Sequence, residues 1–151
     1  MGLWTDAKDM LEAAKLLQEK DEQGLVHPRY FLLGHGLEEA FKAFVRAKGG
    51  TLQCLKSIGH DLELARDWAN TSGLAQFYTL SEEDNQALGM LNPYYRSKEF
   101  EYRVTGYKSY PEPEVLVGLL ERLLSSIKDI CVKSVARKAS PPAHAGVRQK
   151  S

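Results

Sequence analysis

The sequence predicts an all-α protein, an up-and-down bundle of about five helices. Three observations support this prediction. Apolar residues recur at steps of three and four along most of the chain, which is the spacing of one helix face. Capping residues, glycines and prolines divide the chain into segments of helix length. No segment alternates apolar and polar residues in the manner of a half-buried strand. A length of 151 residues with 43% hydrophobic residues is typical of one globular domain.

The first helix is expected over about residues 6–19, with Thr5 as its N-cap. Its buried stripe is expected to consist of Ala7, Met10, Leu11, Ala14 and Leu17. Gly24 ends this unit, and Pro28 suits the first turn of a second helix because its missing N–H costs nothing there. The second helix is expected over about residues 28–48, before the Gly49-Gly50 stop.

The second helix has three distinct sides. The apolar side consists of Tyr30, Leu33, Leu37, Phe41, Phe44 and Val45. The opposite, polar side consists of His35, Glu38, Glu39, Lys42 and Arg46. Between them runs a seam of small residues, which allows another backbone to approach closely, either within one protomer or across a dimer interface. The members of this small-residue seam are Gly36, Ala40, Ala43 and Ala47.

Three more elements complete the bundle. A third helix is expected to start near His60 or Asp61 and to end before Gly73. Ser81 and the acids after it predict the capped start of a fourth helix, which Pro93 should kink or end. Residues 102–113 are expected to form a loop. The last helix, over about residues 114–135, has one continuous apolar stripe.

Charge is divided unevenly along the chain. Residues 137–151 contain four bases and no acid, so residues 1–136 carry a net charge of −4. A body of this charge lacks the general basic footprint of a strong nucleic-acid binder, and any such binding requires a local patch. We therefore expect one helical domain over residues 1–136 and a basic, disordered tail over residues 137–151.

Several other classes of protein are disfavoured. The longest apolar runs are a few residues, too short to span a membrane. The N-terminal residues do not have the pattern of a secretion signal, so the expected location is cytoplasmic. Cys54 and Cys131 are isolated and lack the spacing of a metal or redox site. No metal, cofactor or catalytic residue is assigned.

One stretch near the end of the fourth helix interleaves aromatic side chains with cations. Tyrosine can stack on a base and arginine can pair with a phosphate, the chemistry of single-stranded nucleic-acid binding. The candidate ligand-binding residues are Asn92, Tyr95, Arg96, Lys98, Tyr102 and Arg103. The alternative is a helix end whose tyrosines pack on the bundle while its charges are solvated.

Three further residues are secondary candidates. His60 and Asp61 could form an acid–base pair, although capping of the third helix is the simpler role for Asp61. His35 has a glutamate four residues further along the second helix, at Glu39, but no set of residues such as HExxH completes a metal site. We expect a solvated histidine on the polar side of that helix.

Three motifs in this chain resemble those of the HEPN-domain family. They are LEEAFKAFVRAKGG at residues 37–50, GHDLELARDWA at 59–69 and LNPYYRSKEFEYRVTG at 91–106. The resemblance implies a four- to five-helix bundle, often a homodimer. Catalytic members of the family cut RNA without a metal, between the polar motifs of two protomers. Others bind nucleotides or act as protein partners, and many are encoded beside a nucleotidyltransferase in toxin–antitoxin pairs.

The chain departs from the family's ribonuclease motif, in which four to six residues separate an arginine from the histidine that follows it. Arg96 matches the arginine, but Glu101, Tyr102 and Arg103 occupy the positions of the histidine. We therefore expect a non-catalytic, homodimeric HEPN-like module that binds RNA or a nucleotide near Arg96, Tyr102 and Arg103. The alternatives are a protein partner of a nucleotidyltransferase or toxin–antitoxin system, and a metal-independent ribonuclease with an unconventional base, Glu101 or His60.

Overall fold

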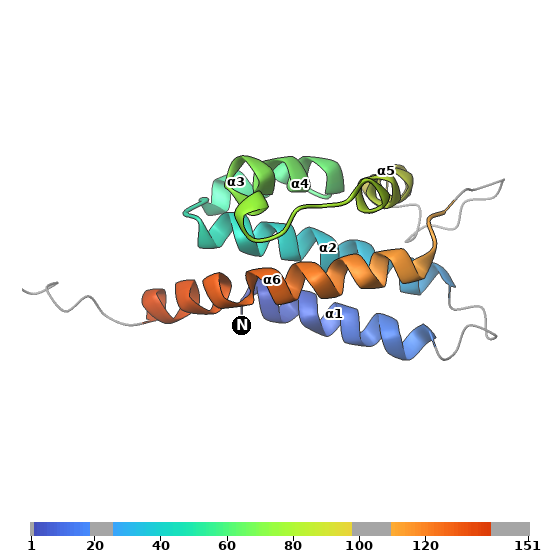
Figure 1. Ribbon diagram of the computed structural model, residues 1–151, viewed down its shortest axis with the longest axis horizontal. Helices are drawn as coiled ribbons and strands as arrows, with labels where there is room; N and C mark the ends of the chain where they lie inside the picture. Colours follow the sequence, from blue (N-terminus) through green and yellow to red (C-terminus); the bar gives the residue numbers. More distant parts are fainter. Residues whose placement is uncertain (1, 19–25, 98–109, 140–151) are drawn as a thin grey trace, which may run out of the picture.

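The computed structural model describes residues 2–18, 26–97 and 110–139, and in these ranges all the regular secondary structure is helical (Figure 1). The all-α class predicted from the sequence is therefore confirmed. The described helices are α1 (Leu3–Gln18), α2 (Val26–Ala47), α3 (Leu52–Ile58), α4 (Leu62–Thr71), α5 (Glu82–Arg96) and α6 (Pro113–Ala139), with a single 3₁₀ turn, η2, at Leu74–Gln76.

Helix α2 is the centre of the bundle, because it contacts each of the other five described α-helices. On one side it packs with α1 and α6, which run alongside it (Figure 1). On the other side it is covered by α3, α4 and α5. All six residues of its predicted apolar side are buried, so the periodicity identified this part of the core.

The small-residue seam of α2 packs inside the protomer. A Cβ atom placed on Gly36 would lie 2.7 Å from Leu120 Cδ2 and 3.3 Å from Met10 Cβ, so α1 and α6 approach closer there than any larger residue permits. Ala40 and Ala43 are also buried. Close intramolecular packing thus accounts for these positions.

Two helix boundaries at the N-terminal side differ from the prediction. Helix α1 begins at Leu3 rather than after Thr5, because the Asp6 amide already bonds to the Gly2 carbonyl. The Trp4 indole fastens this added turn to α6 by donating to the Leu124 carbonyl at 2.9 Å. Helix α3 is an additional element, and its N-cap Thr51 accepts a hydrogen bond from the Cys54 amide.

Pro93 does not end α5, which was one of the two expectations for it. Helix α5 continues through Pro93 to Arg96, where tertiary contacts hold its end. Helix α6 reaches Ala139 and so includes residues 137–139, which the sequence had placed in the tail. Residues 140–151 and most of the predicted 102–113 loop lie outside the described ranges. Within those ranges no helix combines the length and apolar character needed to cross a membrane.

Candidate functional site

Most of the predicted site residues gather at one corner of the molecule, which we call the α4–α5 corner. It is formed by the middle of α2, the turn before α4 and the last two turns of α5. The residues found there are His35, His60, Asp61, Asn92, Tyr95 and Arg96. Lys98, Tyr102 and Arg103 lie outside the described residues, as does Glu101.

Glu38 of α2 is the centre of this corner, and only 4% of it is exposed. Its carboxylate accepts hydrogen bonds from Lys42 Nζ at 2.7 Å, Tyr95 OH at 2.6 Å and His60 Nδ1 at 2.9 Å. Burial alone would raise the pKa of Glu38, but these three donors outweigh it and hold the pKa below its usual value. Glu38 is therefore an ionised carboxylate at neutral pH.

A second histidine joins this network through Tyr95. The Tyr95 hydroxyl gives its proton to Glu38, so His35 Nδ1, 3.2 Å from the hydroxyl oxygen, has to be the donor in that contact. His35 Nε2 lies 2.7 Å from Glu39 Oε1. Burial raises the pKa of Glu39 more than the neighbouring His35 lowers it. Five titratable groups thus form one chain, Glu39–His35–Tyr95–Glu38–His60.

His60 is the end of this chain that reaches solvent. Its side chain is 51% exposed, and the edge of its ring meets the ring of Tyr95 with centroids 6.2 Å apart. Because ionised Glu38 can only accept, His60 Nδ1 carries a proton. In the neutral imidazole the other nitrogen, Nε2, then holds a lone pair, and no described residue hydrogen-bonds it. This arrangement can accept a proton from a molecule at the surface.

Asn92 fixes the turn that carries His60. It is 3% exposed, and its Oδ1 accepts from the Leu62 amide at 2.7 Å. Its Nδ2 donates to Asp61 Oδ1 at 2.9 Å and to Glu63 Oε1 at 3.1 Å. Asp61 is the N-cap of α4 and accepts from the Leu64 amide, so the capping role predicted for it is confirmed. Asn92 therefore ties the start of α4 to α5.

Arg96 is the most exposed cation of the described corner, with 64% of its side chain accessible, whereas Lys42 is 12% accessible. Its Nη1 lies 3.4 Å from Asp61 Oδ2, a long contact. Burial would raise the pKa of Asp61, but hydrogen bonds from Leu64, Asn92 and Arg96 hold it below its usual value. Arg96 thus lies at the surface beside the Asp61 carboxylate, which already accepts hydrogen bonds from Leu64 and Asn92.

The close approach of α5 to α2 depends on Gly34. A Cβ atom at this position would lie 2.6 Å from Tyr95 Cδ1, so the tyrosine ring rests directly on the helix backbone. The same position of the ring brings the Tyr95 hydroxyl to Glu38. Glycine at this position therefore lowers the helix propensity of α2, but it permits the hydrogen bond from Tyr95 to Glu38.

The polar side of α2 is largely covered, and His35, which was expected to be solvated there, contacts Tyr95 and Glu39. Glu38 and Glu39 are buried, and Lys42 donates both to Glu38 and to the Gly59 carbonyl. The reason is that the turn before α4 and the end of α5 cover this side. The sequence did contain a signal: a polar stripe at helical spacing beside two glycines, Gly34 and Gly36, indicates a polar face prepared for close packing.

A second polar cluster joins α5 to α6 elsewhere in the bundle. Asp84, 1% exposed, accepts from Tyr78 OH at 2.6 Å, from the Ser81 amide at 3.0 Å and from Arg122 Nη2 at 2.9 Å. Ser81 and Asp84 also form a capping box at the start of α5. Burial would raise the pKa of Asp84, but its donors lower it overall. We call these residues the Asp84 cluster.

Among the described residues, no group of three or more His, Cys, Asp or Glu side chains is arranged to hold a metal ion. Comparisons with models of protein families, with curated proteins and with solved structures gave no significant match. The chemistry proposed below is therefore argued from the α4–α5 corner and from the motifs quoted above.

Proposed function

We propose that the protein is a HEPN-like module that binds single-stranded RNA or a nucleotide at the α4–α5 corner without cleaving it. The observation that supports this proposal is that the same corner carries the exposed guanidinium of Arg96, in contact with Asp61, and the half-exposed imidazole of His60, which the buried Glu38 holds. An arginine can pair with a phosphate through two parallel hydrogen bonds, and a histidine ring can stack on a base or donate when protonated.

The electrostatics of the corner set a condition on such binding. Glu38, Glu39, Asp61 and Glu63 all lie there, and each accepts hydrogen bonds from protein groups. A phosphate has to compete with Asp61 for Arg96, and the 3.4 Å separation makes that contact weak.

The test is a titration of labelled single-stranded RNA, and separately of ATP, with wild type and Arg96→Gln. The matched control is Lys8→Gln, which removes one exposed cation from α1, on the other side of α2. We expect Arg96→Gln to weaken binding about tenfold and to reduce its salt dependence, because one phosphate contact is lost. Equal affinities for all three proteins would refute the proposal and favour a protein partner.

A second candidate function is metal-independent RNA cleavage with His60 as the base. The specific observation in its favour is the 2.9 Å contact from Glu38, which orients the ring as a carboxylate does in catalytic dyads and triads. His60 Nε2 would take the proton of a ribose 2′-hydroxyl, the 2′-oxygen would attack phosphorus, and the 5′-oxygen would leave and be protonated by solvent. Arg96 would stabilise the negative charge of the phosphate.

Cleavage and binding are separated by one gel experiment. Wild type, His60→Gln and Arg96→Gln are incubated with RNA in the presence of a chelator, next to a substrate with a 2′-deoxy sugar at each position. Loss of cleavage in both variants and with the deoxy substrate would establish the second function. Intact RNA in every lane, together with retained binding by His60→Gln, would eliminate it and leave the binding module.

A further inference from the structure

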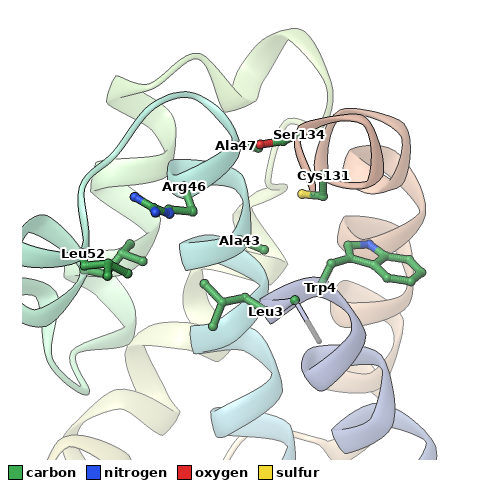
Figure 2. A pocket seen from close by; sticks show the side chains of 10 residues that line it. Leu3, Trp4, Ala43, Arg46, Ala47, Leu52, Cys131 and Ser134 are labelled. Carbon is green, nitrogen blue, oxygen red and sulfur yellow. The ribbon is translucent and has the colours of Figure 1, made fainter. Parts of the chain in front are cut away.

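A hollow lies at the C-terminal end of α2, away from the α4–α5 corner (Figure 2). It has a volume of about 250 Å³ and lies among the starts of α1 and α3, the last turn of α2 and the later turns of α6. Among the residues that line it are Leu3, Ala43, Arg46, Leu52, Leu55 and Cys131.

The inner wall of the hollow is apolar. Ala43, Leu55 and Cys131 are each buried, and the small side chain of Ala43 leaves the space open. Burial raises the pKa of Cys131 to about 12, so its thiol is a neutral, apolar wall at physiological pH. Since an apolar cavity of about 150 Å³ holds benzene, this hollow has room for about ten non-hydrogen atoms.

The rim of the hollow is positive. Arg46 Nη1 donates to the Gly50 carbonyl at 2.9 Å, and a guanidinium has four further N–H donors. None of the residues that line the hollow is acidic. Leu3 is the first residue of α1, where the first N–H groups have no partner carbonyl within the helix and the helix dipole is positive. Charge complementarity therefore selects an anionic group at this end.

We infer that this hollow binds a small monocarboxylate with an unbranched apolar body, of the size of octanoate. The carboxylate pairs with Arg46 and the chain crosses Ala43 toward Cys131. Figure 2 shows Arg46 on one side, Cys131 on the other and Ala43 between them. Leu52, which is 63% exposed, closes over the chain at the rim. The site is separate from the α4–α5 corner and does not depend on the function proposed for that corner.

The chain contains its own reporter for this binding. Trp4 lines the hollow, and the second tryptophan, Trp68, lies on α4. In the full chain with Trp68→Phe, the emission of Trp4 should change saturably as octanoate is added below its micelle-forming concentration. Octanol, which has the same chain without the charge, should bind about tenfold more weakly, because it loses the charge-assisted hydrogen bonds to Arg46.

Two leucines of equal exposure provide the decisive variants. Leu52→Glu places a negative charge on the rim, and Leu16→Glu places one at an α1 leucine that is 65% exposed outside the hollow. Neither side chain is in the core, so both variants should fold, which circular dichroism checks. We expect Leu52→Glu to weaken octanoate binding about tenfold and Leu16→Glu to leave it unchanged.

Three results would overturn the inference. The first is an octanoate titration without saturation, and the second is octanol binding as tightly as octanoate. The third is an equal loss of affinity in the two leucine variants. Amide chemical-shift changes provide an independent check, since they should be confined to Ala43, Arg46 and the other lining residues.

Discussion

The α4–α5 corner and the Asp84 cluster have the same arrangement of donors around a buried carboxylate, but only the carboxylate of the α4–α5 corner also contacts a histidine. Each has a carboxylate that is almost completely buried, a tyrosine hydroxyl at 2.6 Å, a basic side chain within 3 Å and a pKa held below the usual value. The donors to Asp84 are an amide, a phenol and a guanidinium, none of which titrates near neutrality.

Glu38 instead contacts His60 directly and His35 through Tyr95, and His60 reaches solvent. The difference shows that an ionised buried carboxylate is by itself a structural feature of this fold. What distinguishes the α4–α5 corner is its connection to two histidines, of which His60 is exposed enough for a ligand to touch.

The largest expected effect comes from neutralising either carboxylate. Glu38→Gln and Asp84→Asn should each lower the free energy of unfolding by about 3 kcal/mol at pH 7, because each removes a buried charged acceptor that binds a cation, Lys42 or Arg122, and a tyrosine. Urea unfolding followed by circular dichroism measures this. A loss below about 1 kcal/mol in either variant would mean that its network is looser than the distances indicate.

Removing each tyrosine hydroxyl sharpens the comparison. Tyr95→Phe and Tyr78→Phe should both cost about 2 kcal/mol, since each loses a hydrogen bond to a charged group. Only Tyr95→Phe should also alter the imidazole nitrogen chemical shifts of His35 and His60. Identical histidine spectra in wild type and Tyr95→Phe would show that the two histidines are not linked through Tyr95.

Two glycine-to-alanine substitutions test the contact between α2 and the Tyr95 ring. Gly34→Ala should destabilise the protein by about 1 kcal/mol, because the overpacking outweighs the gain in helix propensity. The control is Gly89→Ala in α5, where the nearest atom, Glu63 Oε2, is 3.6 Å from the added Cβ. That change should stabilise by about 0.5 kcal/mol. If both alanines stabilise, the ring does not rest on the backbone.

The smallest expected effect is on the pH dependence. Because the folded-state pKa values of Glu38 and Asp84 are lowered, each stabilises the fold above its unfolded-state pKa, and this contribution is lost as the pH falls through the folded-state value. Glu39, whose pKa is raised, acts in the opposite sense and offsets part of the loss. Between pH 6 and 3, wild type should therefore lose more stability than Glu38→Gln. Parallel curves would contradict the lowered pKa of Glu38.

Local signals in the sequence were sufficient for the longer helices and for two of the caps. The stripe of α2, the N-cap Asp61 and the cap at Ser81 all appear where their residues predict them, because each depends on neighbours within about one turn. Helix α3 had the same kind of signal in Thr51 and Gly59, but its single short apolar face was too brief to stand out.

Boundaries that depend on distant contacts were not predictable in this way. Helix α1 gains a turn through the bond from Trp4 to the Leu124 carbonyl, and α5 continues beyond Pro93, where Tyr95 is held by Glu38. Neither partner is adjacent in sequence, so helix propensity and capping rules could not place these helix ends.

The sequence by itself determined an all-helical bundle, the core side of α2 and the concentration of candidate residues at the start of α4 and the end of α5. Only the tertiary structure decided that Glu38 lies at their centre and that His60 faces it rather than Asp61. The physical reason is that periodicity identifies which residues share a side of a helix. Whether a polar side meets water or another helix depends on how closely that helix approaches, and at Gly34 this distance is set by a tyrosine some sixty residues away.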